Sequence, residues 1–216
     1  MKRVFGLFEA AFDALYLIVA FGIGFFLLFA EARSPVRLLA GVAALVLGIG
    51  DLFHLVPRMA VIVARREEIF RSHLGRGKQI ASITMTVFYL LLWQILRYVV
   101  RSDGYEFWDF AIYFLAMVRI ALCLLPQNRW RDRYPPVAWG VWRNIPFFML
   151  GIAVAWRFYL VRNAVPALRP MWLAIVLSFA CYLPVVLWSN RNPKIGMLMF
   201  PKTCAYLWML AMFLFL

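Results

Sequence analysis

Three ionisable residues, Asp51, His54 and Arg58, lie close together in residues 48–59, one of the most apolar segments of the chain. An α-helix brings positions three, four and seven residues apart onto one face, so the three side chains would share a face. A carboxylate and an imidazole can exchange protons near neutral pH, and a guanidinium can hold a carboxylate or phosphate. Ionisable groups cost free energy at membrane depth, so we expect them to line a polar pocket.

The composition predicts an all-α polytopic membrane protein. The chain has 216 residues, of which 65% are hydrophobic, whereas about half is usual for a soluble domain. Seven apolar stretches each exceed the ~17 residues needed to cross the hydrocarbon. We expect spans at 4–30, 37–64, 79–100, 107–126, 137–160, 168–189 and 195–216. No connection is long enough to separate domains, so residues 1–216 are treated as one seven-transmembrane-helix bundle. Residues 4–30 exceed the length of a signal-peptide core, so we expect a retained first helix.

The net charge of +13 is explained by topology rather than by nucleic acid, for which no binding module is present. The N-terminus and the even-numbered connections carry twelve Lys and Arg residues, against five in the odd-numbered connections. The twelve are Lys2, Arg3, Arg65, Arg66, Arg71, Arg76, Lys78, Arg129, Arg131, Arg133, Arg191 and Lys194; the five are Arg33, Arg37, Arg101, Arg162 and Arg169. Positive residues remain on the inside, which predicts a cytoplasmic N-terminus and an outer C-terminus. The short connections suggest a prokaryotic plasma membrane.

This orientation places polar residues of all seven spans in the cytoplasmic half of the bundle. We therefore expect a cavity that faces the cytoplasm. Its candidate ligand-binding residues are Glu9, Asp13, Arg58, Arg119, Arg143, Asn144, Tyr182 and Lys202, with Asp51 and His54 as catalytic residues if the protein is an enzyme. No metal or cofactor is expected, because two histidines and three scattered cysteines fit no metal-binding motif.

Each of these residues could instead have a purely structural role. In that case Asp51 and His54 would join neighbouring helices by hydrogen bonds. Glu9 and Asp13 would lie at the interface, and Arg58 and Lys202 would extend to the headgroups. Arg119 lies well inside its span, where an ion pair with Asp51 or Asp13 is the main structural explanation.

Two dipeptides resemble known families without assigning one. Pro126-Gln127 resembles the proline–glutamine pair of the PQ-loop transporters and of the KDEL receptor, which are also seven-helix bundles. Gly50-Asp51 resembles the Gly-Asp motif of membrane lysoplasmalogenases, which would imply lipid hydrolysis. Each match covers two residues.

Three hypotheses follow. The first is a bundle that binds or transports a small anionic or amphipathic, lipid-like ligand, with Asp51 and His54 allowing proton coupling. The second is an intramembrane lipid hydrolase in which Asp51 or His54 acts as the general base. The third is a structural subunit whose polar groups hold the helices together. Membrane lipids are expected partners in every case, and the sequence does not identify a protein partner.

Overall fold

The structure is a computed structural model that describes residues 2–29, 34–100, 106–189 and 192–216. Within these ranges the chain forms seven helical segments that are long and apolar enough to cross a membrane, and the last two, Pro166–Trp188 and Lys194–Phe213, each include a 3-10 turn. The α-helices are α1 (Lys2–Phe29), α2 (Pro35–Ala64), α3 (Glu67–Val99), α4 (Glu106–Leu124), α5 (Val137–Leu160), α6 (Met171–Trp188) and α7 (Met199–Phe213). Three short 3-10 helices, η1 (Pro126–Asn128), η2 (Pro166–Leu168) and η3 (Pro193–Leu198), lie in the connections. The predicted all-α fold is confirmed.

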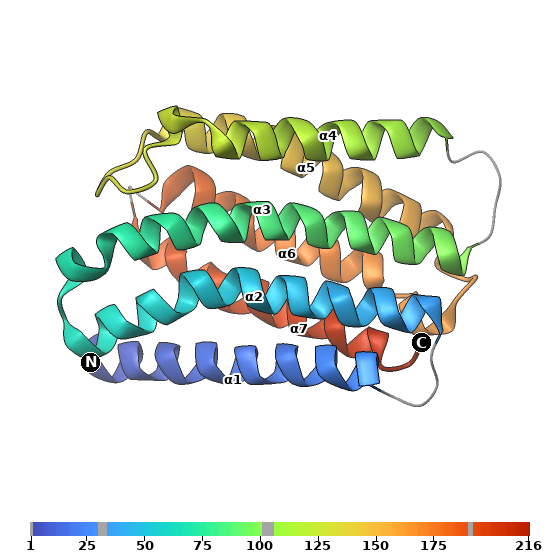
Figure 1. Cartoon of the computed structure of the whole chain (residues 1–216), viewed down its shortest axis with the longest axis horizontal. Helices are drawn as coiled ribbons and strands as arrows, with labels where there is room; N and C mark the ends of the chain where they lie inside the picture. Colours follow the sequence, from blue (N-terminus) through green and yellow to red (C-terminus); the bar gives the residue numbers. More distant parts are fainter. Residues whose placement is uncertain (1, 30–33, 101–105, 190–191) are drawn as a thin grey trace.

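The helices run along the long axis of the bundle in two layers (Figure 1). Helices α1 to α4 form one layer, and α5, α6 and α7 lie behind it. Each helix contacts the next one in the chain, and α7 closes the ring against α1 and α2. The N-terminus lies at one end of the bundle and the C-terminus at the other, so we call these the N-terminal and C-terminal ends.

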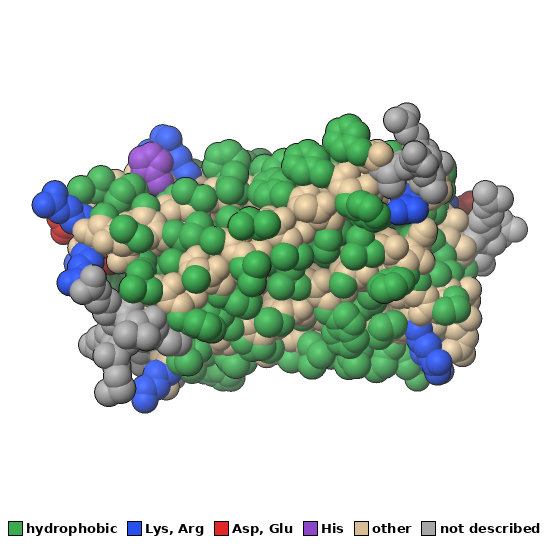
Figure 2. Space-filling view, turned by 90° about the horizontal axis from the view of Figure 1, so that it is seen from below, with side chains coloured by type: hydrophobic (Ala, Val, Ile, Leu, Met, Phe, Trp, Pro, Cys, Tyr) green, Lys and Arg blue, Asp and Glu red, His purple; other side chains and the backbone are tan. Residues whose placement is uncertain are grey.

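The surface between the two ends is apolar, as a membrane requires. Figure 2 shows hydrophobic side chains along the length of the bundle, with Lys and Arg gathered toward its ends. Large side chains such as Ile18, Phe107, Phe110 and Ile152 are between 66% and 72% exposed. Such a continuous apolar surface is not tolerated in water. The chain is therefore a multi-pass membrane protein.

Local signals explain where α2 begins and ends. Ser34 precedes the helix, and its hydroxyl accepts a hydrogen bond from the backbone N–H of Arg37 at 3.1 Å. Pro35 occupies the first turn, where a missing N–H costs nothing. Arg65 ends the helix in the left-handed conformation, with φ of 57°. The predicted span 37–64 differs from the helix by two residues at its start.

The start of the third helix differs from the prediction. Residues 65–78 were expected to form a basic connection, but α3 begins at Glu67, so only Arg65 and Arg66 link it to α2. Glu67 and Glu68 lie in the first turn, where acidic side chains interact favourably with the helix dipole. Gly75 and Gly77, which lie within the expected connection, are buried where the backbones of other segments approach α3.

Two other spans begin later as α-helices than predicted. The sixth was expected from 168, and α6 begins at Met171 after the 3-10 turn of Pro166–Leu168. The seventh was expected from 195, and α7 begins at Met199 after Pro193–Leu198. The helical spans Pro166–Trp188 and Lys194–Phe213, which include these 3-10 turns, remain long enough to cross a membrane.

All seven helices contribute to the apolar core, and an aromatic cluster lies where α3, α5 and α6 meet. The rings of Tyr89, Phe147 and Phe179 pack together, with centroids between 4.9 and 5.5 Å apart. Leu92 and Trp93 continue this core along α3 and are fully buried. These rigid contacts position the polar cavity described next, because Phe147 also forms part of its wall.

Candidate functional site

A cavity of about 440 Å³ lies in the N-terminal half of the bundle. It is bounded by parts of α2 to α7 and by the connection between α4 and α5. Its ionisable and amide or phenol side chains are Asp51, His54, Arg58, Lys78, Arg119, Arg133, Arg143, Asn144, Tyr182 and Lys202. The volume lies within the range of about 300–1,000 Å³ that is typical of small-molecule sites.

Arg119 is the most deeply placed cation of this cavity, and it is 1% exposed. Its Nε donates to Thr86 Oγ1 at 2.9 Å, and its Nη1 donates to the Arg143 carbonyl at 2.9 Å and to Asn144 Oδ1 at 3.0 Å. All three acceptors are neutral. The ion pair with Asp51 or Asp13, which was the main structural explanation of Arg119, is absent from the described residues, so that explanation is wrong.

The rest of the Arg119 network holds the guanidinium in one orientation. Its carbon lies 3.7 Å from the ring centroid of Phe147. Asn144 Oδ1 also accepts from the Tyr182 hydroxyl at 3.1 Å, and Asn144 Nδ2 donates to the Gly140 carbonyl at 2.8 Å. The network joins α3, α4, α5 and α6. A planar guanidinium held in this way presents a preorganised positive charge to the cavity.

Arg143 is held by the connection between α4 and α5. Its Nη1 donates to Asn128 Oδ1 at 2.9 Å, and its guanidinium lies 4.0 Å from the ring centroid of Trp130. Trp130 in turn donates from its indole N–H to the Cys123 carbonyl at 3.0 Å. The connection therefore lines one side of the cavity and holds the Arg143 guanidinium in place as a second cation.

Lys202 also lines the larger cavity and lies near the start of α7. Its Nζ is 5.2 Å from the ring centroid of Tyr182 and 4.8 Å from that of Tyr206. Two aromatic faces stabilise an ammonium without neutralising it. Among the ion pairs of the described residues, none includes Lys202.

A second, smaller cavity of about 50 Å³ adjoins the first between α1, α2 and α7. Glu9 and Asp13 from α1 line it, and Glu9 forms an ion pair with Arg58. The two cavities share six lining residues: Asp51, His54, Arg58, Gly196, Met199 and Lys202. We call these six residues the common wall.

The residues that first suggested a site, Asp51 and His54, belong to the common wall. Asp51 accepts a hydrogen bond from the Tyr16 hydroxyl at 2.6 Å. Nδ1 of His54 is buried and has no hydrogen-bond partner among the described residues. Among the described residues no hydrogen bond joins Asp51 to His54, so they do not form a carboxylate–imidazole pair.

The larger cavity carries a strong excess of positive charge. Six cationic side chains line it, namely Arg58, Lys78, Arg119, Arg133, Arg143 and Lys202, and Asp51 is the only acid among its described lining residues. Like charges in a confined, partly apolar space repel one another. A bound anion would relieve this repulsion.

All ten candidate residues line one of the two cavities: eight line the larger one, and Glu9 and Asp13 line the smaller one. The roles of these ten residues stay predictions.

The sequence did not predict that Lys78, Trp130 and Arg133 line the larger cavity, because these residues were expected to lie in connections between spans. A continuous helix from Glu67 would have placed Lys78 four and seven residues from Ser82 and Met85, on the face that lines the cavity.

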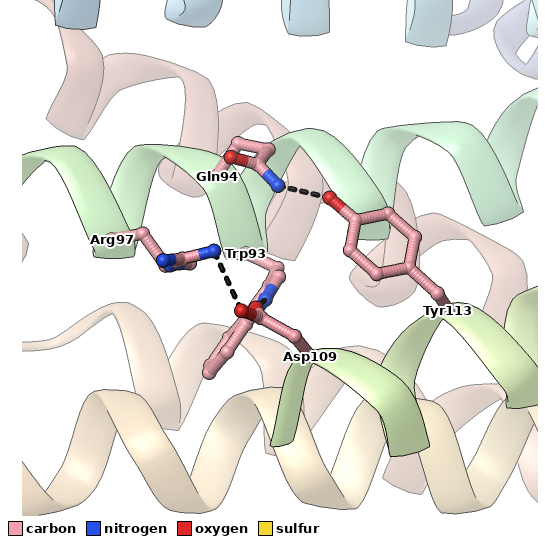
Figure 3. Close-up of polar contacts among 5 residues, drawn as sticks. All are labelled: Trp93, Gln94, Arg97, Asp109 and Tyr113. Carbon is pink, nitrogen blue, oxygen red and sulfur yellow. Dashed lines mark hydrogen bonds and ion pairs between the residues drawn. The ribbon is translucent and has the colours of Figure 1, made fainter. Parts of the chain in front are cut away.

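A separate polar cluster near the C-terminal end of the bundle joins α3 to α4 (Figure 3). Asp109 accepts from the Trp93 indole at 2.7 Å and from Arg97 Nη1 at 2.6 Å, and Gln94 donates to the Tyr113 hydroxyl. None of these residues lines either of the two cavities. Hydrogen bonds of this kind hold membrane helices together, so we assign this cluster a structural role.

Comparisons with known proteins identify no relative. The chain matches no protein-family model, no curated protein and no solved structure. Within the described residues, no group of three or more His, Cys, Asp or Glu side chains could hold a metal ion. A function can therefore be inferred only from the residues of the cavity.

Proposed function

We propose that the protein binds, and moves across or within the membrane, a small amphipathic anion with a phosphate or carboxylate head. The observation that carries this proposal is the charge of the larger cavity, with six cationic side chains and one acidic one among its described lining residues. Arg119 and Arg143 supply guanidinium groups, which suit the oxygens of carboxylates and phosphates.

The rest of the cavity lining supports an amphipathic rather than a purely polar ligand. Met85, Phe147, Val185, Val186 and Met199 contribute apolar surface beside the cations. A ligand with a charged head and an apolar tail would place each part against matching groups, as binding sites of this size usually do.

The distribution of charge along the chain supports the orientation that accompanies this proposal. We place the N-terminal end of the bundle, toward which the larger cavity lies, in the cytoplasm of a prokaryotic cell, and the protein in its plasma membrane. Arg65, Arg66, Arg129 and Arg131 lie in the connections at that end. Positive residues are retained on the inner side and favour its anionic lipids.

Titration of the purified protein with dodecyl phosphate tests the proposal. In a neutral detergent, dodecyl phosphate should bind saturably with one molecule per chain by native mass spectrometry and calorimetry. Dodecyltrimethylammonium, which has the same tail and a positive head, should not bind. Lys202→Met should weaken the binding at least tenfold, because it removes one cavity cation.

The matched control is Arg131→Met, which removes an exposed cation of the α4–α5 connection that does not line the cavity. Its affinity for dodecyl phosphate should equal that of the unchanged protein. Equal binding of the cationic and anionic amphiphiles, or an equal effect of both substitutions, contradicts the proposal.

An intramembrane lipid hydrolase is the second candidate, and the buried, unpartnered Nδ1 of His54 favours it. In that mechanism His54 takes a proton from an attacking water, and Arg58 or Arg119 stabilises the developing negative charge. Incubation of the protein with membrane lipids, followed by mass spectrometry of the lipids, tests this mechanism. A hydrolysis product that is formed by the unchanged protein and by His73→Ala, which alters an exposed histidine, but not by His54→Ala supports the hydrolase. Absence of any hydrolysis product contradicts it.

A further inference from the structure

The smaller cavity differs in charge from the larger one. Three acids line it, Glu9, Asp13 and Asp51, against two bases, Arg58 and Lys202. Both bases belong to the common wall and also face the larger cavity. With all five groups ionised, one negative charge of the smaller cavity is left without compensation.

Among the three acids of the smaller cavity, Asp13 is the one with a buried oxygen that has no hydrogen-bond partner in the described residues. Glu9 pairs with Arg58, and Asp51 accepts the hydrogen bond of Tyr16. Asp13 is 7% exposed, and its Oδ2 is buried without a hydrogen-bond partner in the described part of the chain. An unpaired carboxylate is costly in such a place, and neutralising it relieves that cost.

We propose that the smaller cavity is a proton-binding site in which Asp13 is the proton acceptor, and that its proton is taken up when an anion enters the larger cavity. A hydronium ion gives its proton to Asp13 Oδ2: one O–H bond of the hydronium breaks, one O–H bond forms at the carboxylate, and a water molecule is left. The coupling rests on the proposed function, whereas proton binding by Asp13 does not.

The common wall provides the coupling. An anion in the larger cavity attracts Arg58 and Lys202, the two bases that otherwise compensate the acids of the smaller cavity. As their positive charge is drawn away, the smaller cavity becomes more negative and favours a proton on Asp13. The titratable groups that face Asp13 across this cavity are Glu9, Asp51, His54, Arg58, Lys202 and Tyr206.

A proton suits this site better than a metal cation. The cavity is about 50 Å³, and any metal ion in it would lie beside both Arg58 and Lys202. Two positive charges at such short range oppose a third. A proton on a carboxyl oxygen needs no additional space.

Infrared difference spectroscopy of the full chain in a neutral detergent tests the proposal. Dodecyl phosphate has no carboxyl group, so a carboxylic-acid C=O band that grows when it is added reports the protein. We expect such a band at neutral pH, with a shift in heavy water. It should be lost in Asp13→Asn and kept in Asp13→Glu and in Asp132→Asn, which alters an exposed acid.

Calorimetry on the same samples separates this proposal from the proposed function. Binding of dodecyl phosphate without growth of the band overturns the coupled proton site but leaves anion binding intact. A band that appears on acidification and depends on Asp13, in a protein that does not bind dodecyl phosphate, supports the proton site and contradicts the proposed function. A band that persists in a folded Asp13→Asn protein, or no band at any pH, overturns the inference.

Discussion

Replacement of Arg119 by methionine is expected to weaken the binding of dodecyl phosphate by roughly 30-fold or more. Loss of one partner from a buried, hydrogen-bonded charge pair costs about 2–5 kcal/mol, and Arg119 is the most deeply placed cation of the cavity. Methionine retains much of the apolar volume beside Phe147 and removes the charge. The affinity is measured by calorimetry in a neutral detergent.

The same substitution also removes three hydrogen bonds. Thr86 Oγ1, the Arg143 carbonyl and Asn144 Oδ1 each lose a donor. Hydrogen bonds between membrane helices contribute about 0.6 kcal/mol each, so the unfolding free energy should fall by about 2 kcal/mol. Arg119→Lys keeps a positive charge but cannot reproduce the geometry of the guanidinium group. Its affinity for dodecyl phosphate should therefore lie between that of the unchanged protein and that of Arg119→Met. Unchanged affinity in a folded Arg119→Met protein contradicts this role of Arg119.

Replacement of Gly77 by alanine is expected to destabilise the protein and to distort the site. A methyl group there would lie 2.0 Å from the Phe53 carbonyl oxygen and 2.8 Å from the Cα of His54, both of which are backbone atoms of α2. Helix α2 must therefore move away from α3. Overpacking of this kind costs about 1–3 kcal/mol, and α2 carries Asp51, His54 and Arg58 into the cavities.

Gly22→Ala is the matched control, because a methyl group at Gly22 would have nothing within 4 Å. Alanine favours a helix over glycine by about 0.5–1 kcal/mol, so this variant should be as stable as the unchanged protein or slightly more stable. The midpoint temperature of thermal unfolding in detergent and the affinity for dodecyl phosphate should both decrease in Gly77→Ala, and neither should decrease in Gly22→Ala. Similar behaviour of the two variants would mean that the close approach of α2 and α3 is not required.

The fold was predictable because hydrophobic length determines which segments can cross a membrane. The error at the start of α3 has a physical reason. Charge and glycine content suggested a connection at residues 65–78, yet a helix can extend beyond the hydrocarbon, and Gly75 and Gly77 serve close packing. Sequence alone does not distinguish a glycine that permits a turn from one that admits another backbone.

The members of the site were predictable to a large extent, and their partners were not. Asp51, His54 and Arg119 were predicted to line a polar site because ionisable groups are costly at membrane depth. The partner of each depends on how the helices rotate against one another. Arg119 meets the neutral oxygens of Thr86 and Asn144 rather than a carboxylate, and Arg58 meets Glu9 rather than solvent alone. Among the described residues, Arg58 is the only cation of the larger cavity with a carboxylate ion-pair partner, so the cavity keeps an excess of positive charge.

A structure determined with dodecyl phosphate bound would show whether the larger cavity holds the head of an amphipathic anion. We expect the phosphate to lie within hydrogen-bond distance of Arg119, Arg143 or Lys202, with the alkyl chain against the apolar lining. A phosphate bound only at the exposed arginines of the connections, with the cavity cations paired to protein carboxylates, would contradict this expectation.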